Sequence, residues 1–145
     1  MITSGTAHAI SGPRAAEIAN ITYRQLDYWA RQGWVTPSVA AGTGRPGRRI
    51  YAPEDVVKLA ALGHFGRSGA DVGQLGPGIC GVDLPETGDY LLVSSGGSQV
   101  EVVAAVDLRE RVSSPGPVFV FDPQPLLRRI TSQAETAGIR DRRTA

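Results

Sequence analysis

Arg24 and Gln25 are adjacent side chains of two types that recognise DNA bases well, because arginine can chelate guanine and glutamine can chelate adenine. Both stand near the N-terminal end of residues 22–32, a segment whose spacing predicts a short helix. In a recognition helix this end reaches base edges in the major groove. Tyr28 and Arg31 lie further along, off its apolar face. These side chains indicate contact with nucleic acid.

The flanking residues predict the secondary structure that holds these side chains. Thr22 is suited to cap the helix N-terminus, and Gly33 is suited to end it. Leu26 and Trp29, followed by Ala30, form one apolar face at helical spacing, and we expect Trp29 to lie in the core. A shorter helix is predicted just upstream, over residues 12–19, with a two-residue turn between the helices.

A wing is predicted downstream of this helix-turn-helix. Residues 34–35 and 49–51 are β-prone and enclose a glycine-rich loop, so we expect the wing to span residues 38–49. Its arginines would meet phosphates or a minor groove. A further helix then begins at Pro53, where Glu54 and Asp55 suit the first turn.

The run RQLDYWAR (residues 24–31), with the wing and the helix after it, resembles the DNA-binding domain of MerR-type transcriptional regulators, and an actinobacterial subgroup of them in particular. The resemblance implies a recognition helix in the major groove and a wing on the adjacent backbone. It also implies that Arg24 and Tyr28 occupy DNA-contacting positions. The residues that we expect to contact DNA are Thr22, Tyr23, Arg24, Gln25, Tyr28, Arg31, Arg45, Arg48, Arg49 and Tyr51.

Asp27 departs from the family pattern, in which arginine is common at this position. A carboxylate cannot bind phosphate, so we expect Asp27 to orient Arg31 or Arg24 instead. A second departure is that the glycine-rich stretch over residues 66–88 cannot supply the long helix through which many MerR-type proteins dimerise. A homodimer would therefore have to form through residues 89–138.

Composition and charge further limit the classes of protein to which this chain can belong. The chain has 145 residues, a net charge of +1 and one cysteine, Cys80, which excludes an intrachain disulfide. Residues 1–80 carry a surplus of three positive charges, whereas residues 81–122 carry a surplus of five negative ones. The basic surplus therefore coincides with the expected DNA surface. With no membrane-spanning run and no signal sequence, a cytoplasmic protein is expected.

Catalysis and metal binding are not expected from this sequence. His8 and His64 lack companions at ligand spacing, and no nucleophile stands with a base. No glycine-rich loop has the order of a phosphate cradle. We therefore predict a protein that is not an enzyme and has no metal site or cofactor; any small-molecule effector is left open.

The predicted fold class is α+β, with a winged helix-turn-helix followed by a small β-β-α-β-α domain. Strands are expected over residues 90–94, 99–103 and 118–121, the last of them central or covered on both faces. A last helix follows Asp122. The candidate interface or ligand-pocket residues are Tyr90, Leu92, Val118, Phe119, Val120 and Phe121. The predicted segments are a flexible N-terminus (1–10), the DNA-binding domain (11–75), a Gly/Pro-rich linker (76–88), the small α/β domain (89–138) and a basic tail (139–145).

Three functions remain open. The first is a sequence-specific transcriptional regulator with double-stranded DNA as its partner. The second is an architectural protein of a phage or plasmid, similar to excisionases or small terminase subunits. The third is a protein-interaction or ligand-sensing module whose winged helix is degenerate, which Asp27 and the modest basic surplus would favour.

Overall fold

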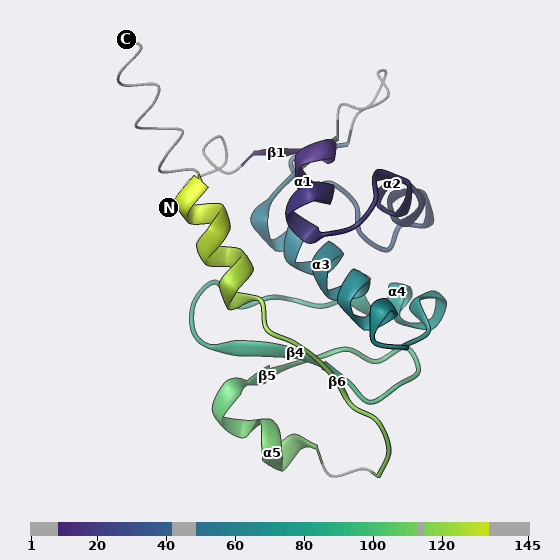
Figure 1. Ribbon diagram of the computed structural model, residues 1–145, viewed down its shortest axis with the longest axis vertical. Coiled ribbons are helices and arrows are strands. Elements are labelled where there is room, and N and C mark those ends of the chain that lie inside the picture. Colours follow the sequence, from purple (N-terminus) through teal and green to yellow (C-terminus); the bar gives the residue numbers. More distant parts are fainter. Residues whose placement is uncertain (1–8, 42–48, 113–114, 134–145) are drawn as a thin grey trace.

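The computed structural model describes residues 9–41, 49–112 and 115–133, which form a mixed arrangement of helices and two small sheets (Figure 1). The expectations for residues 1–8, the wing tip at 42–48 and the tail at 139–145 lie outside the described residues. The helices are α1 (Gly12–Ala19), α2 (Tyr23–Gln32), α3 (Pro53–Arg67), α4 (Val72–Cys80), the short η1 (Ala105–Asp107) and α5 (Leu108–Arg111). The strands are β1 (Ile10–Ser11), β2 (Ala40–Ala41), β3 (Arg49–Tyr51), β4 (Tyr90–Ser94), β5 (Glu101–Ala104) and β6 (Phe119–Phe121). A C-terminal helix is described over residues 124–133.

Helices α1 and α2 form the predicted helix-turn-helix. Pro13 lies in the first turn of α1, and Asn20 ends this helix in the left-handed conformation, with φ of 59°. Thr22 caps α2 as predicted, and Gly33 ends α2 with φ of 78°, which favours glycine. The two helices therefore begin and end where the capping residues in the sequence indicate.

The first sheet differs from the prediction in two of its three strands. Strand β3 is central, with β1 and β2 antiparallel on its two sides. The predicted strand at Trp34 and Val35 is wrong, because both backbone N–H groups donate to the carbonyl of Trp29 and so close the end of α2. Ile10 is not part of a flexible terminus: it pairs with Tyr51 and is buried.

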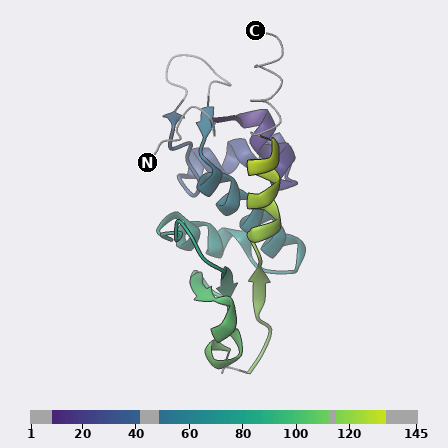
Figure 2. The same ribbon diagram turned by 90° about the vertical axis from the view of Figure 1, so that its left-hand side faces the viewer.

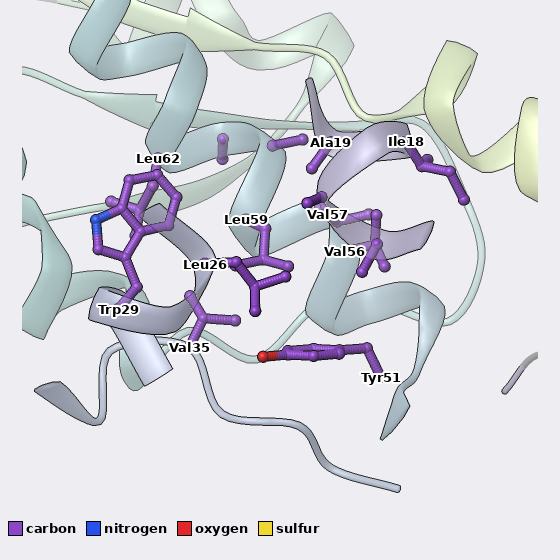
Figure 3. Packing of buried hydrophobic residues seen from close by; sticks show 14 of the residues in the cluster. Ile18, Ala19, Leu26, Trp29, Val35, Tyr51, Val56, Val57, Leu59 and Leu62 are labelled. Atoms are coloured by element: carbon purple, nitrogen blue, oxygen red, sulfur yellow. The ribbon is translucent and has the colours of Figure 1, made fainter. Parts of the chain in front are cut away.

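Helix α3 is the centre of the core. It begins at Pro53 as predicted, and most of its side chains are buried, among them Val56, Leu59 and Leu62. Figure 3 shows these side chains packed with Leu26 and Trp29 of α2. Burial of this apolar surface fixes the position of α2 on the domain.

The predicted linker over residues 76–88 is wrong in its first part, because α4 continues through Gly76, Pro77 and Gly78. These glycines allow close packing. A Cβ on Gly76 would lie 2.1 Å from Cδ2 of Trp34, and one on Gly78 would lie 1.7 Å from the carbonyl oxygen of Ser98. Helix α4 therefore lies in contact both with the segment after α2 and with the β4–β5 loop.

The second sheet has the order β5-β4-β6, with antiparallel pairing throughout. The predicted hairpin is confirmed, but β6 is an edge strand and β4 is central, which corrects the expected position of residues 118–121. The apolar composition of residues 118–121 suggested a central strand. It is explained instead by α3, which covers one face of β6: the rings of Phe65 and Phe119 are 6.4 Å apart. Asp122 caps the C-terminal helix through the backbone N–H of Gln124, at 3.0 Å.

Both halves of the chain contribute to one hydrophobic cluster. Leu92 of β4 and Ile130 of the C-terminal helix belong to the same cluster as the buried residues of α1 and α3. The C-terminal helix turns back and lies beside these two helices in both views (Figures 1 and 2). The second half therefore packs directly on the helix-turn-helix.

Candidate nucleic-acid interface

Helix α2 presents a surface that the core does not use. It buries only Leu26 and Trp29, and the remaining side chains face outward or lie partly covered. Six of the predicted DNA-contacting residues are exposed on this helix and its cap: Thr22, Tyr23, Arg24, Gln25, Tyr28 and Arg31. Tyr28 is 53% exposed, an unusual degree for a large aromatic side chain and one that leaves it free for a partner.

Gln25 has a structural role that was not predicted for it. Its Oε1 accepts a hydrogen bond from the backbone N–H of Thr22 at 2.9 Å, while Oγ1 of Thr22 accepts one from the backbone N–H of Gln25 at 3.0 Å. This reciprocal arrangement is a capping box, which satisfies two unpaired N–H groups. Chelation of adenine needs both the oxygen and the nitrogen of the amide, and here the oxygen is already engaged.

Asp27 joins α2 to β3, the strand at the base of the wing. Its Oδ1 accepts from Nη1 of Arg49 at 2.7 Å, and its Oδ2 lies 3.1 Å from Nε of Arg31. The hydrogen bond from Arg49, with the positive charge of both arginines, lowers the pKa of Asp27. The expectation that Asp27 orients Arg31 is confirmed, the alternative through Arg24 is not seen, and the contact with Arg49 was not predicted.

Two of the residues predicted to contact DNA have little or no exposed surface. The side chain of Arg49 is only 21% exposed and is held by Asp27, so it acts first as a brace at the base of the wing. Tyr51 is fully buried, beside Leu26 and Val35 in Figure 3, and has no surface to offer to DNA. It lies on β3 with its ring in the core, and this burial raises its pKa to about 12. Arg45 and Arg48 lie outside the described residues.

Asp55 anchors the other side of the wing, a role that the sequence did not reveal. Its Oδ2 accepts hydrogen bonds from the backbone N–H of Ala52 and from both the N–H and the hydroxyl of Ser38, at 2.7–3.0 Å. The acid three residues after the N-cap predicts the first of these bonds. Ser38 lies 17 residues away, and nothing in its spacing identifies it as a partner.

Tyr28 and Trp34 form an aromatic contact at the end of α2. Their ring centroids are 5.8 Å apart and their planes are perpendicular, a favourable edge-to-face geometry. Trp34 packs in turn against Gly76 of α4. The exposed ring of Tyr28 is thus positioned by Trp34, which itself packs on α4.

The candidate pocket residues of the second half are not brought into one site. Tyr90 is buried and lines a cavity of about 470 Å³ beside Gln124 and Arg128. Phe121 lines a separate groove of about 280 Å³ next to α1 and α3. Leu92 is fully buried in the core, and Phe119 packs on Phe65. Val118 and Val120 are half-buried and line neither of these two cavities.

Across the described ranges, no three His, Cys, Asp or Glu side chains gather where they could hold a metal ion. None of the described helices is long and apolar enough to span a bilayer.

Comparison with known proteins agrees with the geometry of the first half. Residues 12–73 match the family described as MerR HTH family regulatory protein. A 48-residue segment is 50% identical to uncharacterised HTH-type transcriptional regulators of Mycobacterium bovis and of two strains of Mycobacterium tuberculosis. That segment is 33% of this chain and 21% of each relative, so the match covers only about a fifth of their length. Over residues 12–73, therefore, the chain is similar to MerR-family helix-turn-helix domains.

Proposed function

We propose that the chain is a sequence-specific DNA-binding transcriptional regulator that places α2 in the major groove and the wing on the adjacent backbone. The observation that carries the proposal is the exposed surface of α2, where Arg24 and Tyr28 project from a helix fixed by capping and core packing. The family match over residues 12–73 and the names of the mycobacterial relatives support the same function.

Within this proposal the outward side chains divide into two roles. Arg24 reads a base edge, because it lies in the first turn of α2 and is exposed. Tyr23, Tyr28 and Arg31 contact phosphates through hydroxyl and guanidinium groups. Gln25 and Arg49 act mainly by holding the helix terminus and the wing base in place, as their hydrogen bonds to Thr22 and Asp27 indicate.

Two copies would bind two half-sites, as MerR-type proteins usually do, and we propose residues 89–138 as the region that brings the copies together. Helix α4 has only nine residues, too short for a coiled coil. Strand β6 lies at a sheet edge and carries no charged residue, and charged residues are what normally protect such an edge from pairing. Sedimentation at increasing protein concentration, with and without DNA, tests whether two copies of the chain associate.

The function is tested by selecting bound fragments from a random DNA pool and measuring affinity across a salt series. A regulator of this kind enriches one motif, and the logarithm of its affinity falls linearly with the logarithm of salt concentration, with a slope of about 0.9 per phosphate neutralised. Failure to enrich a motif, together with affinity that does not depend on salt, would contradict the proposal and favour a protein-interaction role.

A further inference from the structure

A groove of about 280 Å³ lies where the helix-turn-helix meets the C-terminal helix. We call it the junction groove. It is lined from α3 by His64 and Arg67, and from the second half by Phe121, Asp122, Leu126 and Arg129. None of the residues that line it belongs to the predicted DNA-contacting set.

The charged side chains give the junction groove a positive balance. Arg67 and Arg129 line it, and Asp122 is the single acid among its lining residues. Oδ1 of Asp122 is already engaged, because it caps the C-terminal helix through the N–H of Gln124. Nη1 of Arg67 donates to the carbonyl of Asn20 at 2.9 Å, which holds the guanidinium while leaving its other N–H groups available.

Apart from Asn20, the rest of the lining is apolar or aromatic. The rings of His64 and Phe121 are 5.6 Å apart and inclined at 50°, and Leu126 lies with them in the lining. Positive groups beside aromatic side chains are complementary to a ligand with an anionic head group and a short apolar body. The volume lies near the lower end for small-molecule pockets, so the ligand must be small.

We propose that the junction groove binds a small organic anion, a carboxylate or phosphate carried on an aromatic or short aliphatic body. The head group pairs with Arg67 and Arg129, and the body packs on Phe121. Such a ligand joins the C-terminal helix to the turn at Asn20, two residues before the cap of α2. An effect of this ligand on DNA affinity would rest on the proposed function, but its binding does not.

Calorimetric titration of the full chain with benzoate and with phenyl phosphate tests the proposal, at constant ionic strength and without DNA. We expect saturable binding of at least one of the two anions, and whichever binds more tightly identifies the head group. Benzamide, a neutral analogue of benzoate, should bind at least about tenfold more weakly, because it offers no charge to the arginines.

Arg129→Gln should weaken binding of the preferred anion by about tenfold or more, since a hydrogen bond between charged groups is lost. Arg128→Gln is the matched control: it is the neighbouring residue on the same helix, but it lines the other cavity. It should bind the anion as the unchanged chain does. Absence of binding by both anions, equal binding of benzamide, or equal loss in the two variants would overturn the proposal. Melting temperatures equal to that of the unchanged chain show that neither variant has lost its fold.

Discussion

The carboxylate of Asp27 and the guanidinium of Arg49 are joined by a hydrogen bond of 2.7 Å, which connects the middle of α2 to the strand at the base of the wing. The two elements proposed to meet DNA are therefore held in a fixed relation before DNA arrives. Asp27 stands where the wider family commonly has arginine, so this chain gains a brace at that position instead of a further phosphate contact.

The brace should be measurable in a double-mutant cycle of Asp27→Asn and Arg49→Gln. Both side chains are partly covered, at 28% and 21% exposed, so we expect a favourable coupling free energy of unfolding between them. The same cycle with Arg31→Gln is the control, because Arg31 is 71% exposed and should couple more weakly. Equal coupling in the two cycles would contradict a specific brace.

The Asp27 contacts should persist at neutral pH and be lost only in acid. The pKa of Asp27 is lowered in the folded chain, so its contribution to stability is present above the ordinary value of 3.8 and is lost as pH falls through the lowered value. Comparing the acid unfolding of the unchanged chain with that of Asp27→Asn checks this. If the difference between them changed between pH 5 and 8, the assignment would be wrong.

Tyr51→Phe should leave stability at neutral pH unchanged or slightly raised. The buried hydroxyl of Tyr51 has no hydrogen-bond partner among the described residues, so its removal relieves a desolvation cost of about 1 kcal/mol. Chemical denaturation measures this directly. A loss of more than about 2 kcal/mol would show that the hydroxyl is satisfied.

The same substitution should change the alkaline limb of stability. Burial raises the pKa of Tyr51 to about 12, so the stability linked to its neutral form is complete below the unfolded value of 10 and is lost as pH rises toward 12. The slope is about 1.4 kcal/mol per pH unit in that window. The unfolding free energy of Tyr51→Phe should fall less steeply there, and identical curves would contradict the assignment.

Gly76→Ala should destabilise the chain by about 1–3 kcal/mol, because the new Cβ overlaps the indole of Trp34. Gly81→Ala is the matched control at the end of the same helix, where a Cβ meets no atom within 4 Å. Thermal unfolding distinguishes them. If the two variants melted together, the close contact between α4 and Trp34 would not exist in solution.

The sequence predicts most of the local structure because capping and periodicity are local signals. Thr22, Gly33 and Pro53 mark helix boundaries that the structure confirms. The errors arise where long-range packing overrides a local signal. Gly76 and Gly78 indicate a linker, yet they permit close contact of α4 with Trp34 and Ser98.

Contacts between residues far apart in the sequence could not be predicted either. The partnership of Ser38 with Asp55 and that of Asp27 with Arg49 join residues 17 and 22 positions apart, and neither spacing carries a helical or strand period. Tyr51 looks like a wing residue by position, but the pleat of β3 turns its ring into the core. Side-chain type therefore predicted an exposed position correctly for the polar residues of α2 but not for Tyr51.

Base reading by α2 is tested most directly by the complete base-preference profile of Arg24→Ala, measured on the motif selected by the unchanged chain. We expect a loss of about 1–3 kcal/mol confined largely to one base position, where discrimination is relaxed. Arg109→Ala, an exposed arginine on α5 with the same change in charge, should leave the profile unaltered. A uniform loss across all sequences, or an unchanged profile for Arg24→Ala, would contradict the claim that α2 reads DNA bases.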